Sequence, residues 1–292
     1  MPLWVRWFST ILHLVNSMRK NRALNHGETP SAPDIGLWNR LKIQKNVIAA
    51  LMVREVVSRY GRGNLGFIWL LLEPLALVTG VILIWGFAQS DAKNGLPIVT
   101  FVISGYMPLT LWRHISSYPR LMSNNYGLLY HRQTSVFDII VARSLTELSG
   151  VTAACLMVYF FVLSFGLGAP IANPGSLLMG WLFMAWLGFA FGCLVAGLSE
   201  RSEAVSSLIQ PFQYILLPIS GSFYLVSWLP VDVRQLALYI PLPHIYEMIR
   251  EGFFGLQITT YYSVGYVAFW CVILTALGVW SMVSAREGLS FR

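Results

Sequence analysis

The sequence predicts an all-α integral membrane protein with six transmembrane helices and an N-terminal amphipathic interfacial helix. Of its 292 residues, 56% are hydrophobic and only 11% are charged, whereas a soluble domain carries about 25% charged residues. The apolar residues gather in runs of about 17–25, the length that a helix needs to cross about 30 Å of hydrocarbon. Lys and Arg gather in alternate loops, as in multi-pass membrane proteins. An ordinary soluble protein is therefore excluded.

Residues 1–37 are predicted to form an N-terminal extension and linker. The apolar stretch at 3–15 contains Arg6 and His13 and lacks a small-residue cleavage site, so it fits an interfacial helix better than a signal peptide. Initiation at Met18, downstream of this stretch, is an alternative. Gly and Pro residues among polar neighbours at 25–36 indicate a linker.

Residues 38–64 are predicted to form an amphipathic interfacial helix and a turn. Apolar side chains recur here at three- and four-residue spacing, at Leu41, Val47, Ile48, Leu51, Met52 and Val56. Basic side chains supply the other face, at Arg40, Lys42, Lys45, Arg54 and Arg59. This pattern is typical of a helix that lies in the plane of the membrane surface. A helix that packs on a soluble partner is the alternative.

The transmembrane domain is predicted over residues 65–286, followed by a tail at 287–292. Its six apolar runs lie at 65–87, 96–112, 148–167, 177–198, 205–229 and 262–283. All but three of the 20 Lys and Arg residues fall on one side of this arrangement, the exceptions being Lys93, Arg234 and Arg250. Because Lys and Arg favour cytoplasmic loops, both termini are predicted to be cytoplasmic.

Two features within this domain predict local structure. Pro241 and Pro243 divide the long outer loop at 230–261 into two short helices, which re-enter the membrane or lie on its surface. Gly188, Gly192 and Ala196 form a stripe of small residues at four-residue spacing, which lets neighbouring helices approach closely.

The sequence lacks the motifs of several classes of enzyme, which limits the activities expected of this chain. The sequence has no G-x-x-x-x-G-K-[ST] phosphate-binding loop, no G-x-S-x-G and no H-E-x-x-H. We therefore expect no ATP hydrolysis, catalytic residue, cofactor or metal in this chain. The cysteines, Cys155, Cys193 and Cys271, lie in apolar runs and indicate packing. The net charge of +7 is explained by membrane orientation, without nucleic acid as a partner.

His244 and Glu247 lie three residues apart on a predicted short outer helix. This spacing places both side chains on one face, where they are candidates for a metal site or an acid-base pair. Because no further ligands accompany them, a helix cap or a gate contact is the favoured interpretation.

The start of the first predicted span combines basic, aromatic and acidic residues. Arg59 and Arg62 are expected among anionic headgroups, with Trp69 as an interfacial anchor. Glu73 lies about 12 Å into the span at 1.5 Å per residue, where an ionisable group is costly unless it is paired or protonated. Pro74 removes a backbone hydrogen bond and predicts a kink beside Glu73. A kinked helix with a structural role only is the alternative.

Residues 59–74, with Gly-Asn-Leu-Gly-Phe-Ile-Trp and Glu-Pro, resemble the start of the first span in type-2 ABC exporter permeases, particularly those of capsular polysaccharide export. Shorter stretches are also similar: Pro97-Ile98-Val99, Ser104-Gly105-Tyr106, Leu111-Trp112-Arg113, and Pro241-Leu242-Pro243-His244 with Glu247, Arg250 and Gly255. The likeness covers residues 38–286, and only the first motif is specific. Residues 1–37 match nothing in that family.

The resemblance implies a type-2 ABC exporter fold in the bacterial inner membrane. It implies a homodimer whose subunits each dock on a separate nucleotide-binding ATPase, which binds ATP and Mg. The cargo would be lipid-linked capsular polysaccharide, moved from cytoplasm to periplasm. A periplasmic or inner-membrane export co-protein and an outer-membrane channel would complete the system.

The resemblance also implies roles for particular residues. The helix at 38–59 corresponds to a gate helix, and the gate and translocation path would use Arg59, Arg62, Trp69, Glu73, Pro74, His244 and Glu247. A coupling helix at about 119–132 would dock on the ATPase through Tyr126, Leu128, Leu129, Tyr130 and Arg132. A loop that rests on lipid headgroups is the alternative for this segment.

Three other functions remain open. The same machine can export O-antigen, teichoic acid or another lipid-linked cargo. A membrane-embedded glycosyl- or acyltransferase would need clustered acidic or His residues at one membrane face. Glu200 and Glu203, which flank Arg201, fit a solvated loop better than such a cluster. A scaffold without transport would have no ATPase partner.

Overall fold

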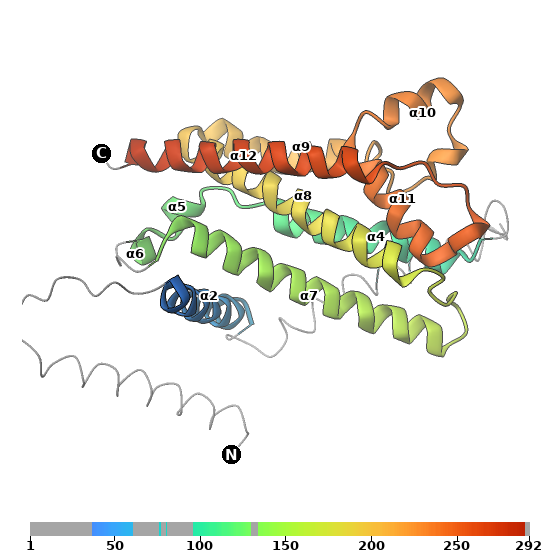
Figure 1. Ribbon diagram of the computed structural model, residues 1–292, viewed down its shortest axis with the longest axis horizontal. Helices are drawn as coiled ribbons and strands as arrows, with labels where there is room; N and C mark the ends of the chain where they lie inside the picture. The colour runs from blue at the N-terminus through green and yellow to red at the C-terminus, as the bar shows by residue number, and fades with distance from the viewer. Residues whose placement is uncertain (1–36, 61–75, 77–79, 81–95, 130–133, 290–292) are drawn as a thin grey trace, which may run out of the picture. The chain divides into compact units, whose positions relative to one another are not determined.

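The computed structural model describes residues 37–60, 76, 80, 96–129 and 134–289 (Figure 1). Within these ranges the chain is helical and has no strand, as predicted. The α-helices are α2 (Leu37–Tyr60), α4 (Ile98–Ser116), α5 (Leu121–Asn124), α6 (Tyr126–Leu129), α7 (Val136–Ser164), α8 (Pro174–Arg201), α9 (Glu203–Leu216), α10 (Val231–Ala237), α11 (Pro241–Phe254) and α12 (Val264–Leu289). Two short 3-10 helices are η2 (Val226–Trp228) and η3 (Gly255–Gln257). Residues Lys45–Arg292 form one compact unit, and the contacts between helices lie within it.

Three of the described helices are long and apolar enough to cross a membrane. They are α7, α8 and the part of α12 at Val264–Ala285, and they coincide with the spans predicted at 148–167, 177–198 and 262–283. Helix α7 begins well before residue 148, because Ser135 and Asp138 form a capping box at its N-terminus. The N-terminal part of α7 therefore occupies residues 136–147, which lie between the spans predicted at 96–112 and 148–167.

The other predicted spans have different outcomes. Helix α4 covers the run at 96–112 and continues to Ser116, with Arg113 and His114 in its last turn. The run at 65–87 lies outside the described residues, apart from residues 76 and 80, and so do residues 1–36, the turn at 61–64 and the last three residues of the tail. The six-span arrangement therefore stays a prediction.

The predicted span at 205–229 is not one continuous helix. Helix α9 ends at Leu216, and the chain then passes through turns to η2. Pro218 has no backbone N–H to continue the helical hydrogen bonds, and Gly221 has a φ of +90°, which favours glycine. Hydropathy identified the apolar run correctly, but these residues end the helix inside it.

The loop predicted at 230–261 contains two short helices, α10 and α11, as expected from Pro241 and Pro243. Pro241 is the first residue of α11, where its missing N–H leaves no hydrogen bond unmade. Helix α11 is buried along most of its length, and it packs against both α8 and α4 (Figure 1).

Helix α8 packs against α4, α11 and α12 (Figure 1). Its stripe of small residues faces α4: a Cβ atom added at Gly192 would lie 2.6 Å from the carbonyl oxygen of Ile115. Another part of α8 meets α12, where a Cβ atom at Gly278 would lie 2.7 Å from the Cβ atom of Cys193. The small residues therefore act in close helix packing, as the sequence predicted.

Helix α2 forms over the range predicted for the interfacial helix. Leu51 packs against a buried cluster that includes Tyr118 and Ile140. The side chains of Val53, Val56 and Val57 are exposed. Its position at the membrane surface stays a prediction.

Candidate functional site

The segment expected to contact an ATPase forms two short helices, α5 and α6, between α4 and α7. The carboxylate of Glu200, at the end of α8, holds the start of α5. Its Oε1 atom accepts hydrogen bonds from the backbone N–H groups of Met122 at 2.6 Å and Ser123 at 3.1 Å. The Ser123 hydroxyl donates to Oε2 of the same carboxylate at 2.5 Å. Glu200 thus satisfies backbone donors that the first turn of a helix leaves without partners.

Arg120 makes a second connection between this segment and the end of α8. It has a left-handed backbone conformation, with φ of 52°, which turns the chain into α5. Its backbone N–H donates to Ser199 Oγ at 2.9 Å, and its guanidinium lies 2.8 Å from Glu203 Oε1. The interpretation of a solvated loop was therefore wrong for Glu200, whose carboxylate binds the backbone of α5, whereas the Glu203 side chain is 80% exposed, in agreement with that interpretation.

The sequence contained one sign of the role of Glu200. A carboxylate in the last turn of a helix lies beside the negative end of the helix dipole, which disfavours it. Glu200 occupies that position in α8, so a partner elsewhere in the chain was to be expected. Sequence alone does not identify Met122 and Ser123 as that partner.

The residues predicted to contact the ATPase differ in exposure. Tyr126 of α6 is 69% exposed. Leu128 and Leu129 are half-buried and pack against the cluster that contains Leu121 and Met122. Tyr130 and Arg132 lie outside the described residues. Among the predicted contact residues that the structure describes, Tyr126 is thus the side chain most available to a partner.

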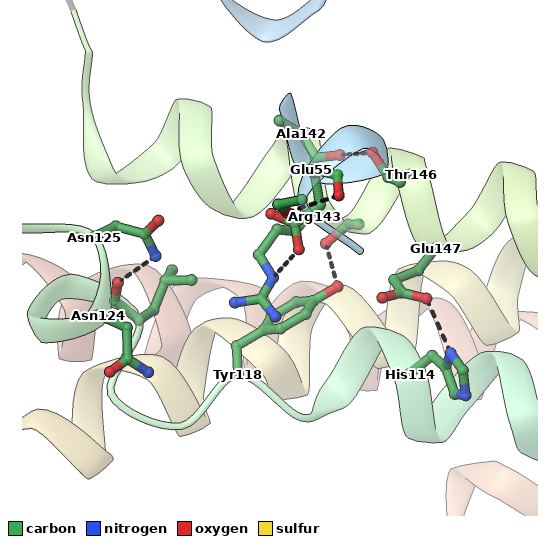
Figure 2. A network of polar contacts seen from close by, with 12 residues as sticks. Glu55, His114, Tyr118, Asn124, Asn125, Ala142, Arg143, Thr146 and Glu147 are labelled. Atoms are coloured by element: carbon green, nitrogen blue, oxygen red, sulfur yellow. Dashed lines mark hydrogen bonds and ion pairs between the residues drawn. The ribbon is translucent and has the colours of Figure 1, made fainter. Parts of the chain in front are cut away.

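A polar network next to this segment joins three helices (Figure 2). His114 Nδ1 of α4 lies 2.9 Å from Glu147 Oε2 of α7, and Arg143 Nε of α7 lies 3.3 Å from Glu55 Oε1 of α2. The Arg143 guanidinium also lies over the ring of Tyr118, 4.9 Å from its centroid. These contacts bring α2, α4 and α7 together beside the predicted coupling segment.

A cavity of about 200 Å³ opens beside this network. Its walls mix cationic, amide, hydroxyl and carboxylate groups, from Arg113, His114, Ser117, Tyr118, Arg143, Glu147, Gln210 and Gln213. Gln213 is buried and donates to Ser116 Oγ at 2.8 Å. This lining is suited to water or another polar molecule and unsuited to lipid chains.

The predicted outer gate residues, His244 and Glu247, are buried in α11 and bind backbone groups. Glu247 accepts a hydrogen bond from the N–H of Val226 at 3.0 Å and another from Tyr261 at 3.1 Å. His244 Nδ1 accepts from the N–H of Ser263 at 3.1 Å, and Nε2 lies 2.9 Å from the carbonyl oxygen of Leu238. Since that carbonyl only accepts, Nε2 carries the proton of a neutral imidazole.

Arg250, on the next turn of α11, completes this group. Its guanidinium donates to the carbonyl oxygen of Ser222 at 2.7 Å and to that of Tyr224. It also lies over the Phe101 ring, 4.5 Å from the centroid. Glu247 and Arg250 therefore hold the irregular chain that follows α9, whereas His244 binds the chain after α10 and before α12.

Burial shifts the pKa of two side chains in this group. It lowers the pKa of His244, against a smaller opposing effect of the hydrogen bond to Leu238. Burial also raises the pKa of Glu247. The hydrogen bonds from Val226 and Tyr261 and the positive charge of Arg250 oppose this increase. Among the described residues, no group of three or more His, Cys, Asp or Glu side chains is placed to hold a metal ion.

The remaining predicted gate residues lie at the start of the first predicted span. Arg62, Trp69, Glu73 and Pro74 lie outside the described residues, as does the side chain of Arg59. Of the predicted gate residues, the structure thus describes only His244 and Glu247 in full, three residues apart on one face of α11.

In the part of the chain that the structure describes, long apolar helices with structured polar segments between them define an all-helical protein of the membrane-spanning class. Residues 46–254 match the ABC-2 type transporter family, and the chain belongs to that family. The resemblance noted in the sequence is therefore confirmed.

Three similar proteins cover most of this chain. The capsule polysaccharide export inner-membrane protein CtrC of Neisseria meningitidis serogroup B is 36% identical over 248 residues, 85% of this chain and 93% of CtrC. BexB of Haemophilus influenzae, with the same description, is 34% identical over 85% of this chain and 94% of BexB. The polysialic acid transport protein KpsM of Escherichia coli is 25% identical over 84% of this chain and 95% of KpsM.

Proposed function

We propose that this chain is the transmembrane subunit of an ATP-driven exporter that moves lipid-linked capsular polysaccharide from the cytoplasm to the periplasm. The observation that carries the proposal is the similarity to two capsule polysaccharide export inner-membrane proteins over 85% of the chain. Membership of the ABC-2 type transporter family supports the same class of function. Multi-pass insertion in the inner membrane agrees with the long apolar helices.

The proposed subunit crosses the membrane six times and has both termini in the cytoplasm. The distribution of Lys and Arg supports this orientation, since all but Lys93, Arg234 and Arg250 fall on the side of the termini. Residues 38–64 act as an interfacial gate helix and turn. Two copies form the channel, as the resemblance to type-2 ABC exporters implies.

A separate ATPase subunit binds ATP and Mg and supplies the energy. The lack of a phosphate-binding loop in this sequence supports that division of labour. The exposed Tyr126 side chain on α6 is the proposed contact with a groove of the ATPase, together with Tyr130 and Arg132. Leu128 and Leu129 support α6 from beneath, because they pack on the buried cluster around Leu121.

The proposed translocation path begins among Arg59, Arg62 and Trp69 and includes Glu73 and Pro74. At the outer end, Glu247 positions the segment that follows α9 through its hydrogen bond with Val226. Glu247 and His244 also position the chain before α12, through hydrogen bonds with Tyr261 and Ser263. A periplasmic or inner-membrane co-protein and an outer-membrane channel carry the polymer onward.

The experiment that tests this function is deletion of the gene, followed by fractionation of lipid-linked polysaccharide into cytoplasmic and surface pools. Full-length capsular polymer trapped inside the cell is the expected result. Loss of polymer in both pools would instead indicate a transferase. Unchanged capsule at the surface, with another lipid-linked polymer trapped inside, would assign the exporter a different cargo.

Co-purification adds a second readout. The tagged full-length chain, extracted in mild detergent, is expected to retain an ATPase subunit. A chain that retains none would be a scaffold, contrary to the proposal.

A further inference from the structure

The coupling segment is connected to α8 more extensively than a loop between α4 and α7 requires. Glu200 accepts hydrogen bonds from the backbone of both Met122 and Ser123 and from the Ser123 hydroxyl. Arg120 adds the backbone hydrogen bond to Ser199, while its ion pair with the exposed Glu203 side chain contributes little. The charge-assisted hydrogen bonds to Glu200 are stronger than neutral ones.

Apolar packing reinforces these polar contacts. Leu121 and Met122 are fully buried, and they belong to one cluster with Cys193 and Ala196 of α8. Asn125 donates to the carbonyl oxygen of Leu121 at 2.9 Å, which stiffens the segment internally. Helix α5 therefore has both a polar and an apolar attachment to the last two turns of α8.

The opposite end of α8 is attached to α11 as closely. A Cβ atom added at Gly252 of α11 would lie 2.5 Å from the Cβ atom of Leu177 in α8. The N–H groups of Ala172 and Asn173, just before α8, donate to the carbonyl oxygen of Gly252 at 3.0 Å and 2.9 Å. Since α8 has 28 residues, it separates these two attachments by about 40 Å at 1.5 Å per residue.

We infer that Glu200 is a positioning residue that fixes α5 to α8, so that α5, α8 and α11 move as one body when the ATPase acts on the coupling segment. This inference rests on the proposed function, since it concerns how that exporter transmits force. As a positioning residue, Glu200 contacts neither the cargo nor the nucleotide. Its effect comes through α5, while α11 carries the Glu247 hydrogen bonds that hold the outer segment.

The first test compares three variants in the full-length exporter, reconstituted with its ATPase. Glu200→Ala removes both acceptor oxygens, and the expected result is a fall of about tenfold in polymer exported per ATP hydrolysed. Glu200→Gln keeps one acceptor oxygen, so it is expected to recover part of that loss. Glu203→Ala is the matched control, because this neighbouring carboxylate has an 80% exposed side chain and such ion pairs contribute little.

Assembly and coupling must be measured separately. Glu200→Ala is expected to leave the amount of bound ATPase and its affinity for ATP unchanged, while hydrolysis continues with about tenfold less polymer exported per ATP. A purely structural role would lower assembly and export together. Wild-type coupling in Glu200→Ala would overturn the inference.

The second test replaces the hydrogen bonds by a covalent link. In the double variant Ser123→Cys and Glu200→Cys, the two thiols replace side chains that are in contact. Without a cross-linker this variant is expected to be uncoupled, and a short bis-alkylating reagent, which forms a C–S bond with each thiol and releases two halide ions, is expected to restore coupling. A monofunctional thiol reagent is the control, and it also covers labelling of the native Cys155, Cys193 and Cys271.

The cross-linked variant shows whether α5 and α8 move together as one body or whether α5 moves relative to α8 about a hinge. If α5 moves relative to α8 during transport, the link blocks export and the inference is wrong. Failure of the proposed function is distinguishable, because it appears in the wild type as an absence of export-coupled ATP hydrolysis. Failure of the inference appears only in the variants, beside a coupled wild type.

Discussion

Arg143 of α7 forms an ion pair with Glu55 of α2, with 3.3 Å between Nε and Oε1 (Figure 2). Both side chains are largely buried, at 24% and 17% exposure. The pair therefore connects the helix before the first predicted span to the helix after the coupling segment. A contact between such distant parts of the sequence can be tested by exchanging the two charges.

Arg143→Glu alone places two carboxylates next to each other and is expected to destabilise the protein by about 2 kcal/mol, between the values for exposed and fully buried pairs. The double variant Glu55→Arg and Arg143→Glu restores opposite charges and is expected to regain at least half of that loss. The measurement is the thermal unfolding midpoint in detergent, followed by Trp fluorescence. Additive losses in the double variant would contradict the ion pair.

Gly197 of α8 tests the close packing against α12. A Cβ atom there would meet the backbone of Ser281 at 2.5 Å, too close for any side chain. Gly197→Leu is expected to destabilise the protein by about 3 kcal/mol, because the two helices must separate. Gly265→Ala is the control, since nothing lies within 4 Å of a Cβ atom at that position. Equal unfolding midpoints for the two variants would disprove close packing at Gly197.

Glu247 tests the attachment of the segment after α9 to α11. Glu247→Leu leaves the buried N–H of Val226 and the partly buried N–H of Tyr261 without acceptors, and the expected loss is about 3 kcal/mol of stability. Glu251→Gln, on the same helix, keeps an oxygen for the hydrogen bond from Ser176 and is expected to have little effect. Protease cleavage within residues 217–229 is the specific readout. Wild-type resistance of Glu247→Leu would contradict the role of Glu247.

His244 predicts a pH dependence of stability. Because the pKa of His244 is below its ordinary value of 6.5, the unfolded chain binds more protons in the interval between the two values. The stability that neutral His244 confers is thus present above pH 6.5 and is lost as the pH falls through the folded-state pKa. Protonation would direct Nδ1–H against the N–H of Ser263.

His244→Gln is the comparison for this prediction, since an amide offers a donor and an acceptor but does not titrate. Unfolding midpoints are measured between pH 8 and pH 5 for both proteins. The difference between them is expected to shrink or reverse at the acidic end. A constant difference over the whole range would mean that His244 does not titrate on unfolding.

Tyr126 tests the proposed ATPase contact. Tyr126→Ala removes a 69% exposed ring from α6, and it is expected to weaken retention of the ATPase by about tenfold, as aromatic contact residues often do. Tyr239→Ala is the control, because Tyr239 is 72% exposed and lies on the predicted outer side. The measurement is the amount of ATPase that co-purifies at increasing salt concentration. Equal retention by both variants would remove Tyr126 from the interface.

Much of the fold followed from local sequence patterns. Hydropathy located α7, α8 and α12, since a span needs only a long enough run of apolar residues. Pro241 marked the start of α11, and the spacing of Gly188 and Gly192 predicted close packing of α8. Each of these features depends on residues that are neighbours along one segment.

The end of α9 and the role of Glu200 required the tertiary structure. Hydropathy is as high after Leu216 as before it, yet the chain leaves the helix and is held by Glu247 and Arg250 of α11. Glu200 looks like a solvated carboxylate until α8 is packed beside α5. Sequence patterns thus determine which segments are helical and apolar, because those properties are local. Packing decides which polar groups meet, because a buried donor can find its acceptor only where the folded helices bring the two together.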